Sequence, residues 1–389
     1  MIKEFSKLVK IQVFSSKNRD TKVAFDEVTG PLDPSPALIL FFASTVYAFD
    51  ELTASFRAKY PESEVVGVTT VGEIHQQGIK EQTLVVASFS RQSFAVKAVF
   101  LERIHEFPIL QRQQLVAAAE AVGMNIQSKA PEQQGFALVF PNGLINAEER
   151  LLSVVNSVFT YEGFPVFGGT AGDDAQFVET YTSLNGEYAT TAGIVIFVKP
   201  QVEFQIYRES IFERYVSDTL VATKVDVKAR RVYEFNGKPA AQVYANLLGT
   251  TERALEKKFM AHPLGFVGKR LSVASPMCVH EDSSITFYCQ ILRNAQLQLL
   301  QPCDVLQTID ATVELVKQDF TQIDGVLAIN CILRKIQFQQ TNRLQAVNER
   351  LSRLPNLFGF CSYGEQLHNE QINQTLVLLA MGAKHGGRR

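Results

Sequence analysis

Three short segments of the sequence place a hydroxyl, a glycine and a carboxylate at the same spacing, each after an apolar run. They are motif 1 at residues 70–73 (TVGE), motif 2 at residues 170–173 (TAGD) and motif 3 at residues 362–365 (SYGE). Glycine permits a positive φ or a close approach of another group, while the hydroxyl and carboxylate can cap backbone donors or face a ligand. The sequence leaves both roles open. The candidate ligand-binding residues are Thr70, Gly72, Glu73, Gly169, Thr170, Gly172, Asp173, Tyr363, Gly364 and Glu365.

The same order of elements surrounds each motif. An apolar strand comes first, then an amphipathic helix, then the strand that enters the motif, and a further apolar strand follows. The leading strands are expected at residues 37–43, 135–140 and 325–333, the helices at 49–59, 147–159 and 339–354, and the closing strands at 83–89, 192–198 and 374–381.

This repeated unit predicts a fold class. A long crossover permits parallel pairing of two strands, whereas the shorter turns return the chain antiparallel. We therefore expect an α/β (α+β) protein with layered mixed β-sheets flanked by helices. Because sites in such proteins lie at strand ends, the three motifs are expected to meet around one cleft.

The chain between motifs 2 and 3 has a different character. A strand is expected at residues 219–235, followed by a turn at Asn236-Gly237 and a helix at 240–248. We place a domain boundary at residues 202–210, where the chain leaves an apolar strand.

Two further side chains have chemistry of their own. His262 follows a charged helix at residues 252–259, where an imidazole can cap the last carbonyls or coordinate a metal. Arg334 ends the apolar strand before motif 3, and its guanidinium can clamp a carboxylate bidentately. The alternative for Arg334 is a salt bridge to a nearby Asp or Glu.

Composition excludes several classes of protein. The 389 residues include 38 basic and 40 acidic side chains, a formal charge of −2 that argues against nucleic-acid and anionic-membrane partners. Five cysteines without a CxxC spacing argue against a disulfide framework or a structural zinc site. The apolar runs are shorter than the roughly 20 residues that span a bilayer, and residues 1–14 lack the apolar region of a signal peptide. We expect a cytoplasmic protein.

Six features across most of the chain form one pattern: 70–74 (TVGEI), 167–174 (FGGTAGDD), 232–240 (VYEFNGKPA), 262–265 (HPLG), Cys331 and Arg334 as C-x-x-R, and 359–365 (GFCSYGE). Together they resemble the FIST family, the F-box and intracellular signal transduction proteins. Residue 71 is valine where the family's T-A-G-E-I segment has alanine. The resemblance implies an N-terminal FIST sensory domain at residues 1–205 and a C-terminal FIST domain at 206–389.

The resemblance implies a function as a non-enzymatic sensor of small ligands in intracellular signalling. Amino acids are the ligands proposed for the family. Some bacterial members of this length are haem proteins that sense nitric oxide and regulate a histidine kinase. The resemblance therefore suggests haem b as cofactor, nitric oxide or an amino acid as ligand, and a separate histidine kinase or other signalling protein as partner.

The two ligand hypotheses require different binding residues. Haem needs an axial ligand in an apolar pocket, for which His262 is the first choice and His75 the second. An amino acid without haem would need Arg334 for its carboxylate and the motif carboxylates for its ammonium group.

An enzyme is the remaining alternative. Thr170 beside Asp173 has the form of a threonine nucleophile in an amide hydrolase, but no His or Lys near it in sequence supplies the activating base. Catalysis needs one nucleophile, whereas three similar turns suit architecture. The sequence therefore favours binding over hydrolysis.

Overall fold

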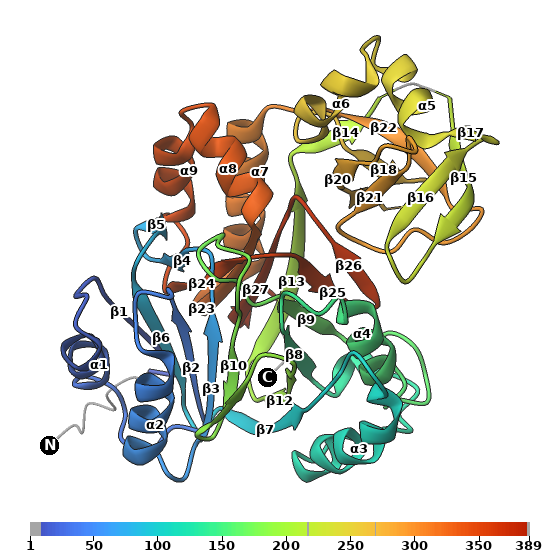
Figure 1. Cartoon of the computed structure of the whole chain (residues 1–389). Coiled ribbons are helices and arrows are strands. Elements are labelled where there is room, and N and C mark those ends of the chain that lie inside the picture. Colours follow the sequence, from blue (N-terminus) through green and yellow to red (C-terminus); the bar gives the residue numbers. More distant parts are fainter. Residues whose placement is uncertain (1–8, 216–217, 269, 387–389) are drawn as a thin grey trace, which may run out of the picture.

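The computed structural model describes residues 9–215, 218–268 and 270–386, and residues 1–8 of the leading segment lie outside these ranges (Figure 1). In the described part, the strands form three six-stranded sheets and a further nine-stranded sheet. Helices flank the sheets, and parallel and antiparallel pairs occur together in each large sheet. The expected class of layered mixed sheets with flanking helices is confirmed.

The first large sheet shows the arrangement that the other two repeat. Its two central strands are parallel and joined by helix α2, as the long crossover predicted, and the closing strand returns antiparallel beside them. Helices α1 and α2 pack on one face of this sheet. The strands in order are β1 (Ile11–Ser16), β6 (Leu84–Phe89), β2 (Leu38–Ala43), β3 (Glu64–Thr69), β10 (Thr182–Leu184) and β11 (Glu187–Ala189), with α1 (Thr21–Thr29) and α2 (Phe49–Lys59).

The second large sheet has the same strand order. Helices α3 and α4 pack on its outer face through a separate apolar cluster. Its strands in order are β7 (Phe94–Leu101), β12 (Gly193–Pro200), β8 (Phe136–Pro141), β9 (Val166–Gly169), β25 (Glu365–Leu367) and β26 (Glu370–Ile372), with α3 (Arg112–Ala121), α4 (Glu148–Asn156) and the 3-10 turns at Pro108–Gln111 and Pro131–Gln133.

The third large sheet again repeats the order. It differs from the first two in having three helices on its outer face. Its strands in order are β13 (Glu203–Ser210), β27 (Thr375–Lys384), β23 (Phe320–Cys331), β24 (Leu357–Ser362), β4 (Glu73–His75) and β5 (Gly78–Lys80), with α7 (Val305–Asp319), α8 (Ile332–Gln340) and α9 (Leu344–Leu351).

The hairpin that follows each motif leaves its own sheet and joins another. After motif 1, β4 pairs with β24 of the third sheet, and after motif 3, β25 pairs with β9 of the second. The strand β10, which follows motif 2, pairs with β3 of the first sheet. The three units are therefore linked in a closed cycle by exchanged hairpins.

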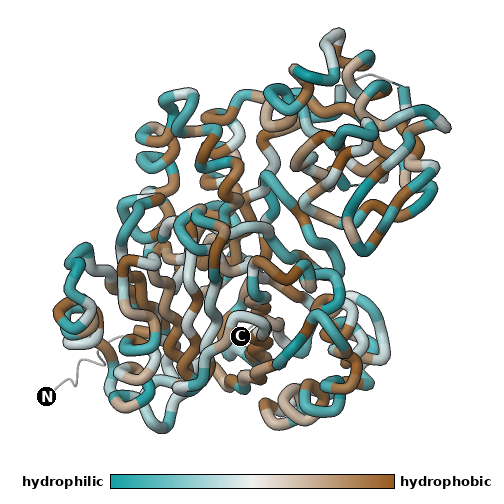
Figure 2. Tube along the Cα trace, in the orientation of Figure 1, coloured by the Kyte–Doolittle hydropathy of each residue, from teal (hydrophilic) through white to brown (hydrophobic). Residues whose placement is uncertain are grey.

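The inner faces of the three sheets share one apolar core. Phe42 of β2, Phe140 of β8 and Phe360 of β24 meet there, with ring centroids 4.8 to 6.1 Å apart. All three side chains are fully buried. Figure 2 shows the hydrophobic colour concentrated along these central strands, whereas the outer loops are mostly hydrophilic. The shared core holds the carboxyl ends of the parallel strands, and thus the motifs, close together.

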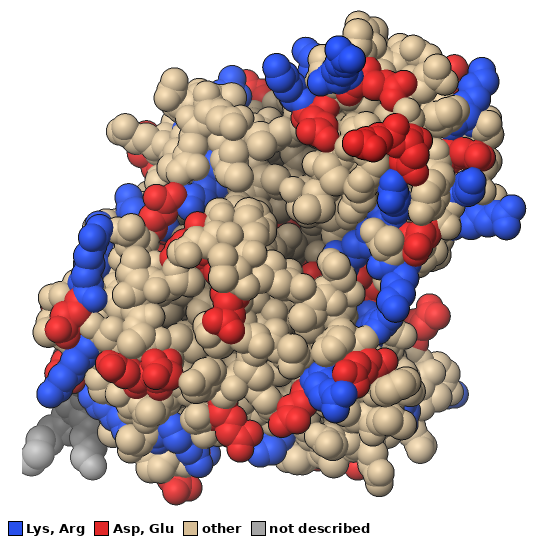
Figure 3. Space-filling model, in the orientation of Figure 1, with Lys and Arg blue, Asp and Glu red and all other residues tan. Residues whose placement is uncertain are grey.

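Residues 212–302 form a compact insert between β13 and α7, with its own apolar core. It lies at the upper right of Figure 1, and Figure 3 shows a hollow between it and the rest of the molecule. On the face drawn in Figure 3, basic and acidic side chains are interspersed. The elements are β14 (Phe212–Arg214), β15 (Leu220–Asp226), β16 (Arg231–Phe235), β17 (Lys238–Pro239), α5 (Ala240–Leu247), α6 (Glu252–Phe259), β18 (Leu264–Phe266), β19 (Ser272–Ala274), β20 (Pro276–Val279), β21 (Ile285–Phe287) and β22 (Gln296–Pro302).

Two expected elements were wrong in detail. The single strand at 219–235 is an antiparallel pair, β15 and β16, because the chain reverses between them. The single helix at 339–354 is two helices, α8 and α9, separated by a turn in which Asn342 has a φ of 54°. The predicted division after residue 205 falls within β13 and stays a prediction.

Candidate ligand-binding site

The structure brings the three motifs together at the carboxyl ends of the parallel strands. Backbone hydrogen bonds join motif 1 to motif 3, motif 3 to motif 2, and motif 2 to motif 1, so that the motifs close a ring. The bonds are Val71 N–H to Cys361 O (3.1 Å), Cys361 N–H to Gly72 O (2.7 Å), Thr170 N–H to Gly364 O (2.9 Å) and Gly172 N–H to Thr69 O (2.8 Å). We call this arrangement the motif ring.

The carboxylate of motif 1 is used within the fold. Glu73 is fully buried, and its carboxylate accepts hydrogen bonds from the hydroxyl of Thr70 and from the backbone and hydroxyl of Thr83 (3.0 and 2.6 Å). Burial raises the pKa of Glu73 to about 7. Glu73 thus ties its own motif to the start of β6.

Motif 3 repeats the hydrogen bond from hydroxyl to carboxylate, but Oε2 of its Glu365 is buried without a partner among the described residues. The hydroxyl of Ser362 donates to Glu365 at 2.7 Å, and Glu365 is fully buried. Burial raises the pKa of Glu365 to about 8. In motifs 1 and 3 the hydroxyl and carboxylate therefore stabilise turns.

Motif 2 uses its shorter carboxylate differently. Asp173 accepts hydrogen bonds from the backbone N–H groups of the loop that follows, at Phe177 (2.9 Å), Val178 (2.6 Å) and Glu179 (2.9 Å). The hydroxyl of Tyr363 also donates to Asp173, and burial, together with this hydrogen bond, raises the pKa of Tyr363. Asp173 therefore holds the loop at 173–179 against motif 3.

The environment of Thr170 gives no support to nucleophilic catalysis. Its hydroxyl oxygen accepts a hydrogen bond from the side-chain amide of Gln366 at 2.7 Å, and the residue is fully buried. An amide nitrogen cannot take up a proton as a general base would. The expectation of a non-enzymatic protein stays a prediction, with the hydrolase as its alternative.

At the motif glycines, neighbouring atoms leave little room for a side chain. Gly72 has a φ of 121°, and a Cβ added there would lie 2.9 Å from the carbonyl oxygen of Lys80. A Cβ at Gly364 would lie 2.1 Å from Nε2 of Gln371. Gly169 and Gly172 are crowded in the same way by Ile329 and Val71.

A cavity of about 400 Å³ opens beside the motif ring. Val71 of motif 1, Asp174 after motif 2, Thr45 after β2 and Lys335 on α8 all line it. We call it the ring pocket. The strand ends therefore form a cleft, as expected, but the residues that line it are neighbours of the predicted ones.

Lys335 is a buried cation at the floor of the ring pocket. Its ammonium group donates to the carbonyl oxygen of Val71 at 2.7 Å and pairs with the carboxylate of Glu81 at 2.6 Å. The side chain of Lys335 is 10% exposed, whereas that of Glu81 is 55% exposed. Hydrogen bonding by Lys335 lowers the pKa of Glu81. The ring pocket thus has one fixed cation and one carboxylate able to turn toward solvent.

Asp174 supplies a second, fixed carboxylate. Its Oδ2 accepts from the hydroxyl of Ser44 (2.7 Å) and from the backbone and hydroxyl of Thr45 (2.8 and 2.7 Å). Both Asp174 and Ala175 have positive φ, 52° and 63°, which fixes the loop in an unusual conformation. No hydrogen bond to Oδ1 occurs within the described residues, so this oxygen is open to a donor.

Arg334 does not line the ring pocket. It lies in α8 rather than at a strand end, because β23 ends at Cys331. Its guanidinium is buried, pairs with the carboxylate of Glu209 and donates to Asn330 at 3.0 Å. The structure therefore contains the salt bridge that was the alternative for Arg334.

The two histidines proposed as haem ligands lie apart from the ring pocket. His75 is buried in β4, where burial lowers its pKa to about 4 and its Nε2 has no hydrogen-bond partner. His262 lies in the insert, at the end of α6, and its carbonyl oxygen accepts from the hydroxyl of Tyr244. Neither lines any of the five pockets described, and no described cluster of three His, Cys, Asp or Glu could hold a metal. The surroundings of these two histidines therefore give no support to haem, which stays a hypothesis.

Family models match almost the whole described chain. The FIST N domain matches residues 37–238 and the FIST C domain residues 240–368. The chain belongs to the FIST family. The FIST N match contains motifs 1 and 2, and the FIST C match contains motif 3. FIST domains indicate a sensor of signal transduction.

Among relatives, this FIST protein is similar to the uncharacterized protein MJ1623 of Methanocaldococcus jannaschii. The two are 22% identical over 376 residues, which cover 86% of this chain and 71% of the relative.

Two solved structures resemble the chain weakly. Cyanuric acid hydrolase from A. caulinodans has a TM-score of 0.37 at 8% identity, with 96% of this chain and 99% of that chain covered. PurLQS from Thermotoga maritima has a TM-score of 0.20 at 9% identity, with 96% and 72% covered. Scores this low support no argument about fold or function.

Within the described ranges, no helix has the length and apolar character to cross a membrane. The cytoplasmic location stays a prediction.

Proposed function

We propose that this FIST protein is a sensor that binds a small zwitterion, an amino acid, in the ring pocket. The observation that carries the proposal is that Lys335, held against the motif ring, and Asp174 line the same small cavity. A zwitterion carries the two complementary charges at short separation. Its carboxylate would pair with Lys335 and its ammonium group with the open Oδ1 of Asp174.

Glu81 supports this assignment because it already pairs with Lys335. Its carboxylate is largely exposed and can leave the pocket when a ligand carboxylate replaces it. The exchange keeps the buried ammonium group of Lys335 neutralised throughout, which avoids the cost of an unpaired buried charge. Glu81 thus occupies the place that a ligand carboxylate would take.

The position of the ring pocket suggests how binding is reported. Thr45, Asp174 and Lys335 come from three different units of the fold, so a ligand that contacts all three would favour one arrangement of the motif ring. The signal would then pass to a separate protein, which we propose to be a histidine kinase or another signalling partner.

Isothermal titration calorimetry with each of the common amino acids tests this function. We expect at least one to bind with 1:1 stoichiometry, and the matching amide or decarboxylated amine to bind more weakly because it lacks one of the two charges. The absence of heat for every amino acid at millimolar concentration would contradict the proposal.

The haem and nitric oxide hypothesis has a separate test. Purified protein is mixed with haem and its absorbance spectrum recorded, with and without nitric oxide in the ferrous form. Neither His75 nor His262 opens onto a described pocket. We therefore expect that His75→Ala and His262→Ala will not remove a stoichiometric Soret band. A Soret band lost in His262→Ala or His75→Ala would show that a histidine ligates haem in an arrangement other than this one.

A further inference from the structure

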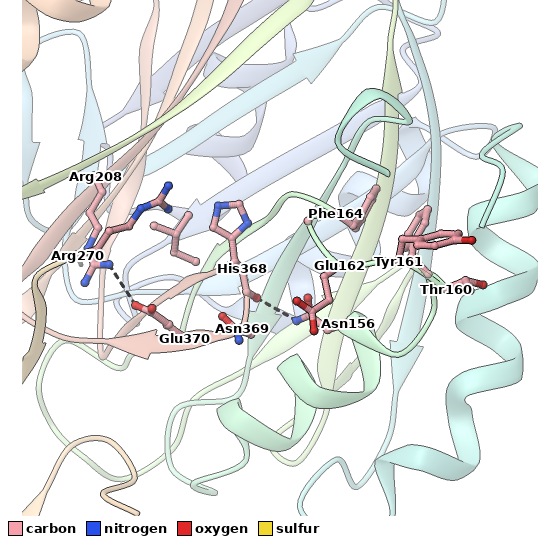
Figure 4. Close-up of a pocket in the computed structure, with 13 residues that line it drawn as sticks. Asn156, Thr160, Tyr161, Glu162, Phe164, Arg208, Arg270, His368, Asn369 and Glu370 are labelled. Atoms are coloured by element: carbon pink, nitrogen blue, oxygen red, sulfur yellow. Dashed lines mark hydrogen bonds and ion pairs between the residues drawn. The ribbon is translucent and has the colours of Figure 1, made fainter. Parts of the chain in front are cut away.

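A second cavity, of about 550 Å³, lies where the insert meets the rest of the molecule (Figure 4). Arg208 comes from β13, Arg270 from the insert, His368 and Glu370 from the hairpin of β25 and β26, and Tyr161 from the segment after α4. We call it the insert pocket. In Figure 4 the two arginines and Glu370 lie at one end, and Tyr161 and Phe164 lie at the other.

Arg208 is a buried cation with an incomplete set of partners. Its side chain is 14% exposed, and it pairs with Glu370 at 3.1 Å and donates to the hydroxyl of Ser272 at 2.9 Å. Its Nε is buried without a hydrogen-bond partner. Burial lowers the pKa of Arg208, and the nearby charge of Arg270 lowers it further. A guanidinium in this position is stabilised by additional negative charge.

Arg270 adds a second positive charge that the described residues do not pair. It makes no hydrogen bond or ion pair with them, although it lines the insert pocket beside His368. Its charge contributes to lowering the pKa of His368, after the larger effect of burial. Among the described residues, Glu370, which is 44% exposed, pairs with Arg208 and not with Arg270. Glu162 also lines the pocket, from the segment after α4.

The hairpin turn that carries His368 is held firmly. His368 has a φ of 55°, its backbone N–H donates to Val166 O at 2.8 Å, and its carbonyl oxygen accepts from Asn156 at 3.1 Å. On the other side, Phe164 stacks on Phe159 with ring centroids 3.9 Å apart. The insert pocket is thus a built cavity with a cationic end and an aromatic wall.

We propose that the insert pocket binds a small organic oxyanion, a carboxylate or a phosphate ester. Its oxygens would pair bidentately with the unpaired guanidinium of Arg270, which matches both groups, and the positive charge of Arg208 would stabilise them. Its apolar body would lie against Tyr161. Such a ligand would join the insert to β13 and to the second sheet, and so fix the position of the insert. This site shares no residue with the ring pocket and does not depend on the function proposed for it.

Calorimetry on the full chain with inorganic phosphate, phenyl phosphate, malonate and benzoate tests the proposal. We expect at least one probe to bind. Comparison of the affinities of the two phosphates with those of the two carboxylates identifies the preferred group. Tyr161→Ala should weaken phenyl phosphate or benzoate more than inorganic phosphate or malonate. Failure of all four probes to bind at millimolar concentration would overturn the proposal.

Matched substitutions assign the binding to this pocket. Arg270→Ala should weaken the bound probe by about tenfold, and Arg270→Lys should recover part of the loss. Arg293→Ala, at an exposed position of the same insert, should leave it unchanged. Equal weakening by Arg270→Ala and Arg293→Ala would show only general charge attraction and would overturn the assignment.

Discussion

The carboxyl groups of Glu73 and Glu365 show how burial changes the chemistry of single residues. Both are fully buried, and burial raises their pKa values to about 7 and about 8, from an ordinary value of 4.5. Two groups that resemble ligand-binding carboxylates in the sequence are therefore held in the interior and favour their protonated forms. Their structural role explains why motifs 1 and 3 do not line the ring pocket with carboxylate oxygens.

The raised pKa values predict a stability that depends on pH. Because the folded state holds these protons more tightly, the stabilisation is complete below pH 4.5 and is lost as the pH rises through about 7 and 8. Each group contributes a slope of up to about 1.4 kcal/mol per pH unit. Glu365→Gln should flatten the decrease in the free energy of unfolding between pH 5 and pH 8.

Chemical unfolding of wild type and Glu365→Gln at several pH values measures this effect. Glu120→Gln, at an exposed carboxylate, is the matched control and should keep the wild-type slope. Equal slopes in all three proteins would show that Glu365 does not titrate in this range.

Glu81 gives a second prediction at the residue scale. Since its carboxylate competes with the ligand for Lys335, Glu81→Gln should tighten amino-acid binding by about three- to fivefold, the size expected for one partly exposed ion pair. Calorimetric dissociation constants measure this change, and Glu349→Gln on α9 is the control. Weaker binding in Glu81→Gln would mean that Glu81 contacts the ligand directly and does not compete with it for Lys335.

The sequence predicted the meeting of the motifs but not the charged residues of the ring pocket. Motif spacing at strand ends is a local signal, and it located the motif ring. Lys335 was missed because the strand was expected to continue to residue 333, which obscured the start of α8 at Ile332. Asp174, the aspartate directly after motif 2, was the available signal for the anionic side of the pocket.

At the scale of elements, the turns of the motifs allow each hairpin to cross to another sheet. Motif 1 can make this crossing only with a glycine at position 72, where φ is 121° and backbone blocks a side chain. Gly72→Ala should therefore lower the free energy of unfolding by about 1–3 kcal/mol.

Thermal or chemical unfolding provides the measurement for Gly72→Ala. Gly249→Ala is the matched control, because its φ of 60° is also positive but no atom lies within 4 Å of the added Cβ. We expect the smaller loss at Gly249. A larger loss at Gly249 would show that backbone conformation alone, without the crowding at Gly72, sets the cost.

Local patterns predicted most individual strands and helices but could not predict their exchange. The strand at 37–43 and the helix at 49–59 agree with β2 and α2, since apolar periodicity is a property of neighbouring residues. The pairing of β4 with β24 joins residues about 285 positions apart, and no local pattern specifies such a partner. The same limit applies to the insert pocket, which four separate segments form.

At the scale of the whole molecule, a buried ion cluster fastens the insert to the second unit. Arg230 of the insert pairs with Glu148 at 2.6 Å and Glu149 at 2.5 Å, both on α4. Arg230 and Glu148 have side chains only 7% and 4% exposed. Nearby negative charge from these two residues raises the pKa of Arg230, against the opposing effect of burial.

Removal of this arginine should loosen the insert. Arg230→Met leaves two glutamates without their cation, and the expected loss is about 3–5 kcal/mol of stability. Small-angle scattering should give a larger radius of gyration than for wild type or the exposed control Arg293→Met. An unchanged radius together with unchanged stability would show that other contacts hold the insert.

The most direct test of the central claim is calorimetric titration of Lys335→Met with the amino acid that wild type binds. Lys317→Met, on the exposed side of α7, is the control, and circular dichroism verifies that both variants fold. We expect at least a tenfold weaker affinity for Lys335→Met, since about 1.4 kcal/mol or more is lost with the charged partner. Wild-type affinity in Lys335→Met would contradict a ligand site in the ring pocket.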